Sequence, residues 1–327
     1  MSQLVSIITY HYVRMLRHSR YPEIMGLDYY LFKEQIAYIK KHYNVISAYD
    51  LIDTIETNSD LPPKALLLTF DDGYIDHFTN VFPVLDMQKL PGLFFPPAKC
   101  ILESQVLDVN KIHFILASVL NKCDILDDIF RLIDENRSSY DLETNEYYWQ
   151  KSEELKRFDS AEVIFIKRIL QRDLPKSLRK IITDCLFNKY VTNDEVSFSQ
   201  ELYMSVEQVS HLQRNGMYVG SHGFDHCWLN YLHDNEQRNE IDLSLQFLKS
   251  IGSNTDRWIM CYPYGEYNNS LLSLLKARNC VVGLTTQPGV ADLQQDNPLT
   301  LPRLDTNDLP KKSNASLNEW TKKAMSV

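Results

Sequence analysis

The sequence predicts an α/β fold with a mostly parallel sheet or barrel, together with an all-helical insertion. Short apolar segments alternate with segments of helical periodicity in residues 1–107 and 200–327, as in consecutive β–α units. Residues from about 108 to 200 break this pattern, because they contain no glycine and a single proline, Pro175. We therefore expect a β/α part formed by 1–107 and 200–327. The insertion, 108–199, would serve as structural padding or as a cap over the substrate cleft.

The expected strands are short and uncharged, and most are followed by a segment of helical periodicity. They cover residues 5–10, 65–70, 92–95, 217–221, 258–262 and 281–285. Segment 65–70 has no charge at all, which is typical of a strand buried on both faces. The expected helices cover residues 31–42, 75–85, 235–251 and 267–279, and one more begins at the capping-box pattern Ser205-Val206-Glu207-Gln208.

Composition and charge exclude several classes of protein. The formal net charge of −9 argues against nucleic acid or an anionic membrane surface as the main partner. The six cysteines are scattered without a CxxC pair, as expected in a reducing compartment, and Cys227 is interpreted as a half-buried thiol rather than a metal ligand. No apolar run is long enough to span a membrane, and the N-terminal residues resemble a first strand rather than a signal peptide. A cytoplasmic location is expected.

Two motifs carry the chemistry, and both lie at the end of an expected strand. Thr69-Phe70-Asp71-Asp72-Gly73 offers two adjacent carboxylates, and Ser221-His222-Gly223-Phe224-Asp225-His226 offers two imidazoles four residues apart. In parallel β/α folds the strand C-termini carry the functional residues. One carboxylate with two imidazoles is the ligand set of a hydrolytic divalent metal, and the second carboxylate could act as a general base. Each motif alone is more often an acidic turn or an ordinary histidine pair, so the prediction rests on their combination.

Adjacent side chains on an extended strand point to opposite sides. A turn at Gly73 must therefore re-aim the two carboxylates, and glycine allows the backbone angles that such a turn needs.

Four stretches carry a resemblance to a known family: Thr69 to Gly73, Ser221 to His226, Tyr262-Pro263-Tyr264-Gly265 and Leu301-Pro302-Arg303. The sequence resembles the polysaccharide deacetylases of carbohydrate esterase family 4, the group with the nodulation-deacetylase homology domain. The resemblance covers about residues 1–107 and 200–327. It implies a distorted (β/α) barrel and metal-dependent removal of acetyl groups, usually N-acetyl groups, from sugars.

The resemblance also implies roles for individual residues. Asp72, His222 and His226 would hold a divalent metal, which we expect to be zinc, with cobalt or nickel as alternatives. Asp71 would take a proton from the attacking water. The backbone N–H of Tyr264, after the proline of the Tyr-Pro-Tyr-Gly turn, would help to stabilise the oxyanion, and a simple tight turn is the alternative.

The sequence departs from the common family pattern at two places. Many members carry an arginine just before the proline turn, where this chain has Cys261 and Tyr262. Arg303 is a candidate replacement partner for Asp71, and an ordinary surface ion pair is the alternative.

Many members also carry a catalytic histidine near the C-terminus, and no histidine follows His233 here. The chain is in this respect similar to the circularly permuted members, whose acid comes from the N-terminal strand. His11 is then the candidate acid for the leaving amine, and a satisfied core histidine is the alternative. His77 is expected on a helix surface.

The predicted partner is an acetylated sugar or a glycan precursor, with Phe95, Trp228 and Pro263 as candidate substrate contacts. Core packing is the more frequent role of such aromatic residues. We expect a metal-dependent carbohydrate N-deacetylase. An O-acetyl esterase, an amidohydrolase on a non-sugar substrate and a non-catalytic sugar-binding protein remain as alternatives. The oligomeric state is left open.

Overall fold

The computed structural model describes residues 3–152 and 159–325. They form two compact units. The first comprises residues 3–15, Gly26–Gln105 and 199–325, and the second comprises Leu16–Met25 with the described residues of Val106–Phe198. The segment Leu16–Met25 leaves the first unit directly after the first strands, and nothing in the sequence pattern had indicated this.

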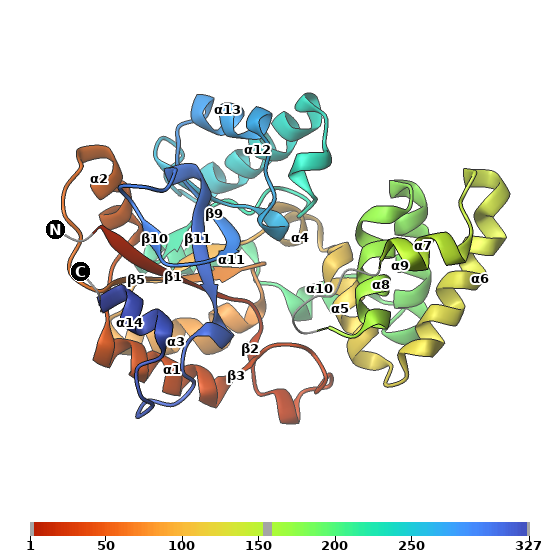
Figure 1. The fold of residues 1–327 in the computed structure, drawn as a ribbon, viewed down its shortest axis with the longest axis horizontal. Coiled ribbons are helices and arrows are strands. Elements are labelled where there is room, and N and C mark those ends of the chain that lie inside the picture. Colours follow the sequence, from red (N-terminus) through yellow and green to blue (C-terminus); the bar gives the residue numbers. More distant parts are fainter. Residues whose placement is uncertain (1–2, 153–158, 326–327) are drawn as a thin grey trace. The chain divides into compact units, whose positions relative to one another are not determined.

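A mostly parallel sheet forms the centre of the first unit (Figure 1). Its strand order is β7-β6-β5-β1-β11-β9-β8, and β4 and β10 pair with β5 and β1 off this path. The two ends of this order also meet, because Ser221 pairs with Met260 and the Cys261 N–H donates to the Ser221 carbonyl over 2.8 Å. The sheet therefore curls into a distorted barrel, as predicted. Its strands are β1 (Leu4–Tyr10), β4 (Asn44–Val45), β5 (Ala65–Asp71), β6 (Leu93–Phe95), β7 (Tyr218–Val219), β8 (Trp258–Cys261), β9 (Cys280–Pro288), β10 (Ala291–Asp292) and β11 (Leu301–Asp305).

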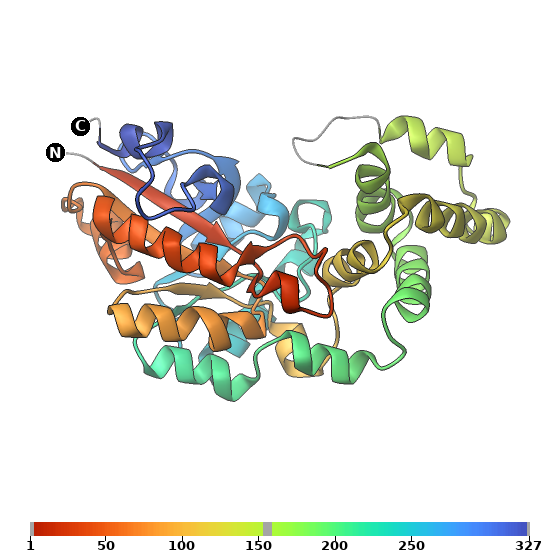
Figure 2. The same ribbon diagram turned by 90° about the horizontal axis from the view of Figure 1, so that it is seen from below.

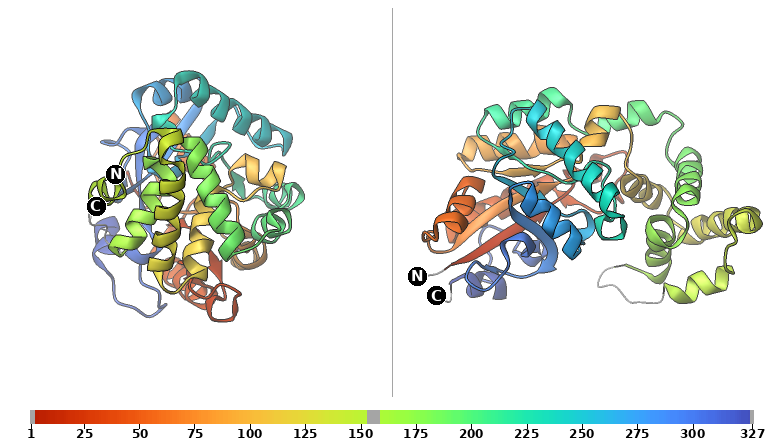
Figure 3. Two further views of the ribbon diagram at one scale, coloured as in Figure 1. Left: turned by 90° about the vertical axis from the view of Figure 1, so that its right-hand side faces the viewer. Right: turned by 90° about the horizontal axis from the view of Figure 1, so that it is seen from above.

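Helices surround this sheet. Figure 2 shows α1, α3 and α11 as neighbours, and α12 packs against α13 and α4 (Figure 3). Each such helix can pack on the sheet through an apolar face. In helix α1 this face contains Phe32, Ile36 and Ile39, which recur at helical spacing and are buried. The helices of this unit include α1 (Tyr29–His42), α2 (Ala48–Thr57), α3 (Phe82–Gln88), α4 (Ala98–Glu103), α11 (Val206–Arg214), α12 (Asp234–Ser250), α13 (Asn269–Ala277) and α14 (Glu319–Met325).

Most expected elements of the β/α part are present, with two differences. Segment 217–221 forms only a two-residue strand, Tyr218–Val219. The helix expected over 75–85 begins instead as a wider π-helical turn, His77–Val81, which continues into α3. His77 on this turn is completely buried, so its predicted surface position is wrong. Its side chain lies against the aromatic rings of Phe70 and Phe94 in the core.

In the described part of the second unit, the principal elements are helices that pack on one another (Figure 3). Buried Leu178 and Ile182 share one face of α9, at a spacing of four. Lys111 is also buried here, between Asp184 at 2.6 Å and Glu195 at 2.9 Å. These helices are α5 (Asp108–Ser118), α6 (Lys122–Tyr140), α7 (Asn145–Lys151), α8 (Ala161–Arg168) and α9 (Lys176–Tyr190), and α10 (Glu195–Leu202) leads back to the first unit.

The described residues were also searched for membrane spans. Within 3–152 and 159–325, no helix combines the length and the apolar character needed to cross a bilayer.

Candidate active site

The aspartate pair lies at the C-terminal end of β5. Asp71 is the last residue of the strand, and Asp72 follows in the left-handed region with a φ of 74°. Gly73 continues this turn with a φ of 68°, and a Cβ atom there would lie 2.7 Å from Pro96 Cβ. The backbone therefore turns at Asp72 itself, one residue earlier than expected. The two adjacent carboxylates consequently take up different partners.

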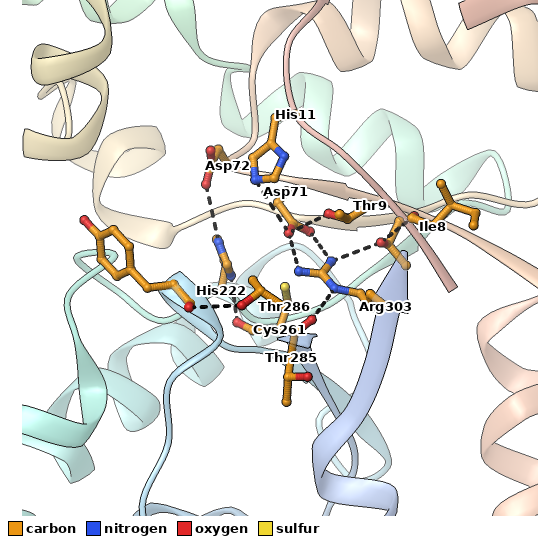
Figure 4. Close-up of polar contacts among 12 residues, drawn as sticks. Ile8, Thr9, His11, Asp71, Asp72, His222, Cys261, Thr285, Thr286 and Arg303 are labelled. Carbon is orange, nitrogen blue, oxygen red and sulfur yellow. Dashed lines mark hydrogen bonds and ion pairs between the residues drawn. The ribbon is translucent and has the colours of Figure 1, made fainter. Parts of the chain in front are cut away.

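The histidine pair follows β7. His222 and His226 are nearly buried, and the Nε2 atom of each faces the same carboxylate oxygen, Asp72 Oδ1, at 3.3 Å and 3.2 Å. The ligand atoms of the three residues all lie within 4.8 Å of one another. Figure 4 shows His222 pointing at Asp72, with the Asp71 carboxylate nearby. The tertiary structure thus brings together the three residues that the sequence predicts as metal ligands.

The donor atoms of this cluster fit a divalent cation. His222 Nδ1 lies 2.7 Å from the Cys261 carbonyl, to which it donates its hydrogen, so Nε2 presents a lone pair whenever the ring is neutral. Among the described residues Asp72 Oδ1 is buried without a hydrogen-bond partner, while the Tyr74 hydroxyl donates to Oδ2 over 2.6 Å. Metal sites commonly have such outer partners, which fix the tautomer of a histidine and the orientation of a carboxylate.

The electrostatics of the cluster lead to the same conclusion. Burial alone would lower the pKa of His222, but Cys261 and Asp72 outweigh it and raise this pKa well above its ordinary value. Burial likewise works against the charge of Asp72, yet its two histidines hold its pKa well below the usual range. The site therefore concentrates negative potential at the imidazoles. A proton or a metal cation can balance it.

Asp71 is held by a different set of groups. Arg303 on β11 donates to both of its oxygens, over 3.0 Å and 2.7 Å, and the Thr9 hydroxyl donates to Oδ2 over 3.1 Å. Both charged side chains are only 1% exposed. Burial works to raise the pKa of Asp71, but Arg303 outweighs it and holds this pKa below its usual range. The predicted pairing of Arg303 with Asp71 is present, and the alternative of an ordinary surface ion pair is wrong.

A second group of potential ligands shares His222. Asp71, His222 and Cys261 also place ligand atoms within 4.8 Å of one another. Both oxygens of Asp71 already accept hydrogen bonds from the Arg303 guanidinium. A cation at this place would compete with that fixed positive charge, so the cluster around Asp72 is the better metal site.

His11 lies beside Asp71. It follows β1, and its Nε2 atom lies 4.0 Å from Asp71 Oδ2. Its side chain is 44% exposed, which excludes the alternative of a core histidine. The buried His77 ring contacts the backbone of His11, since His77 Nε2 lies 3.0 Å from the His11 carbonyl. Its role as an acid stays a prediction.

Tyr264 lies beside the metal-ligand candidates. The residue has a φ of 59°, and its ring forms a T-shaped pair with the His226 ring at a centroid distance of 4.9 Å. Half-buried Trp228 stacks on Tyr264 at 4.3 Å, with ring planes 9° apart. Pro263 is buried within the same turn. The oxyanion role of the Tyr264 N–H and the substrate roles of Trp228 and Pro263 stay predictions.

Phe95 cannot be a substrate contact. It is completely buried in the barrel core among Leu93, Tyr218 and Ile259. It is the last residue of β6, and its side chain belongs to the cluster of buried residues from the other strands. This prediction is wrong, and core packing is its role.

Sequence reasoning missed several residues that support the site. The Tyr74 hydroxyl donates to Asp72, and the Thr9 hydroxyl donates to Asp71. The His77 ring lies within hydrogen-bond distance of the His11 carbonyl. Glu240 on α12 accepts hydrogen bonds from the loop between the two histidines. Tyr74 follows directly after Asp71-Asp72-Gly73, so its position could have suggested a role. Nothing in the sequence pattern distinguishes the other residues from ordinary core or surface positions.

Comparisons with known proteins agree with this geometry. The family model "Polysaccharide deacetylase" matches residues 184–282, which include both histidines and the Tyr-Pro-Tyr-Gly turn. A poly-β-1,6-N-acetyl-D-glucosamine N-deacetylase of Escherichia coli K12 is 35% identical over 65 residues, 20% of this chain and 10% of that protein. YxkH of Bacillus subtilis, for which polysaccharide deacetylation is proposed, is 28% identical over 99 residues, 30% of this chain and 35% of that protein. The alignments thus span only about a tenth and a third of these relatives.

Solved structures share the fold over nearly the whole chain. The deacetylase PplD of Streptococcus pyogenes, solved in complex with acetate, has a TM-score of 0.58 at 16% identity and covers 93% of both chains. IcaB of Ammonifex degensii has a TM-score of 0.57 at 16% identity and covers 100% of this chain and 99% of its own. Together with the curled parallel sheet, these likenesses establish the distorted (β/α) barrel. Residues 184–282 thus match the polysaccharide deacetylase family, and the fold of the chain is that of solved deacetylases.

Proposed function

We propose that this protein is a metal-dependent carbohydrate N-deacetylase. The observation that carries the proposal is the meeting of Asp72, His222 and His226 around one point, next to an aspartate held by a buried arginine. A hydrolase needs an activated water, a base and an oxyanion stabiliser within reach of one bond. This arrangement can supply all three.

Asp72, His222 and His226 would hold the cation, for which zinc is the first choice and cobalt or nickel the alternatives. A divalent metal there would acidify a water molecule and polarise the acetyl carbonyl. Asp71 would accept the proton of the attacking water. Arg303 keeps the Asp71 carboxylate ionised at neutral pH, which is the form that a general base needs.

Two further residues would complete the reaction. The N–H of Tyr264 would donate to the developing oxyanion, which agrees with its position beside His226. His11, partly exposed and 4.0 Å from Asp71, would protonate the leaving amine. Trp228, which stacks on Tyr264, would line the path of the sugar.

The proposed substrate is a glycan, or its precursor, that contains N-acetylated amino sugars. The name of the Escherichia coli relative supports this substrate class. The cytoplasmic location stays a prediction, and cell fractionation with an antibody against the protein would test it.

Acetate release tests the function. The purified protein is incubated with oligomers of β-1,6-linked and β-1,4-linked N-acetylglucosamine, with N-acetylated nucleotide sugars and with O-acetylated sugars. We expect acetate from at least one N-acetylated substrate, loss of turnover after chelation and recovery after Zn²⁺ or Co²⁺ is added. Release from O-acetylated sugars alone would identify an esterase instead. Binding without any turnover in the metal-loaded protein would identify a sugar-binding protein.

A further inference from the structure

The loop between the two histidines is held in an unusual conformation. Gly223 has a φ of 73°, and His226 has a φ of 49°, which non-glycine residues adopt only when their surroundings enforce it. The side chain of His226 must nevertheless reach within 3.2 Å of Asp72. A conformation of this kind needs contacts that fix the loop before any ligand binds.

Helix α4 fixes one side of this loop. Two backbone N–H groups at the start of α4 donate to carbonyls of the loop. The Ala98 N–H donates to the Gly223 carbonyl over 3.3 Å, and the Lys99 N–H donates to the Phe224 carbonyl over 2.9 Å. The Lys99 ammonium also donates to the Asp225 carboxylate over 2.9 Å.

Helix α12 fixes the other side through a single carboxylate. Glu240 Oε2 accepts hydrogen bonds from the Phe224 N–H over 2.9 Å and the Asp225 N–H over 3.0 Å. The residue is only 9% exposed, and the Cys227 thiol, which follows His226 directly, also bonds to it. A Cβ atom at Gly223 would lie 3.4 Å from Glu240 Oε2, so the carboxylate lies directly against the loop.

We propose that Glu240 is a positioning residue for the metal site, which holds the Gly223–Cys227 loop so that His226 meets Asp72 in the metal-free protein. The inference rests on the proposed metal-dependent function. Glu240 touches the amides of residues 224 and 225 rather than any ligand atom, and it therefore acts through the backbone. Outer partners of metal ligands contribute about 10–100-fold to metal affinity, and a similar effect is expected here.

Two conservative substitutions separate the hydrogen bonds from the charge. Glu240→Gln keeps a carbonyl oxygen that can accept both N–H groups, so metal affinity should stay within about threefold of the wild type. Glu240→Asp keeps the charge but withdraws it by roughly 1.5 Å, beyond hydrogen-bond distance. Its metal affinity should fall by about 10–100-fold.

Gln237 supplies the matched control on the same helix. It is buried one turn earlier, and its side-chain amide donates to the Leu229 carbonyl and to Asn268, both outside the loop between the histidines. Gln237→Ala should lower the melting temperature without weakening metal binding. A purely structural role of Glu240 would make Glu240→Asp behave in the same way.

The experiment measures the dissociation constants of Zn²⁺ and Co²⁺ for the metal-free proteins by competition with a chromophoric chelator, together with melting temperatures. His222→Ala serves as the reference for a lost ligand. If the wild type binds no better than His222→Ala, the proposed metal site itself is wrong. If the wild type binds well and Glu240→Asp binds equally well, only the role of Glu240 is wrong. Equal losses in Glu240→Gln and Glu240→Asp would also overturn positioning through the two hydrogen bonds.

Discussion

The buried pair of Arg303 and Asp71 gives the sharpest prediction about stability. Arg303→Met keeps much of the side-chain volume but removes the guanidinium. The substitution leaves Asp71, only 1% exposed, without the two hydrogen bonds at 3.0 Å and 2.7 Å that now offset its burial. Loss of one partner from such a pair costs about 3–5 kcal/mol. This is a large part of the roughly 5–15 kcal/mol that stabilise a typical protein.

The pH dependence of this loss has a defined sign. In the wild type the pKa of Asp71 lies below that of an unfolded aspartate, about 3.9. Its contribution to stability is therefore fully present above that value and is lost only as the pH falls through the lowered folded pKa. Without Arg303, we expect burial to outweigh the remaining effects of His222 and His11 and to raise the pKa of Asp71 in the folded state. The folded variant then binds the extra proton, so its stability deficit should shrink as the pH falls from neutral toward about 5.

Urea unfolding of the metal-free proteins, followed by tryptophan fluorescence, measures both effects. The double variant Asp71→Asn/Arg303→Met is the control, because it removes the buried charge together with its partner. It should recover part of the stability and lose the additional pH dependence. A loss below about 1 kcal/mol in Arg303→Met, or a loss that grows as the pH falls, would refute a buried, charged pair.

Three further predictions concern metal and turnover. Asp71→Asn should retain bound metal, because the proposed ligands are Asp72, His222 and His226, and it should abolish acetate release; near wild-type turnover would remove its assignment as the base. His222→Ala should lower metal affinity by more than the roughly 10–100-fold cost of losing an outer partner, and an unchanged metal content by elemental analysis would contradict ligation. His11→Ala should reduce the rate of acetate release by about 10²–10⁴-fold with metal content unchanged, and a wild-type rate would assign the proton to water or to another residue.

Sequence patterns alone located most of the barrel. The uncharged segment 65–70 forms all of β5 except its last residue, and the capping box at Ser205 begins α11 with both of its hydrogen bonds. Such signals are local, because they depend on hydrophobic spacing and on side chains that bond to the backbone a few residues away. The short strand Leu301–Asp305 escaped notice, since a five-residue segment containing proline and arginine carries no clear strand pattern. Its pairing with β1 and β9 supplies what its sequence lacks.

The residues of the candidate active site can be divided in the same way, into those that the sequence predicted and those that only the structure revealed. Two motifs at strand ends were sufficient to nominate His222, His226 and one of the two adjacent aspartates from the sequence, because parallel strands end at the same rim. The family resemblance then implied that Asp72 is the ligand. Only the tertiary structure decided that Arg303 is buried against Asp71, that Phe95 belongs to the core, and that His77 lies beneath His11. These outcomes depend on burial and on contacts between residues that are tens to hundreds of positions apart. The spacing of residues along a chain does not encode such distances, and the closure of the sheet sets them.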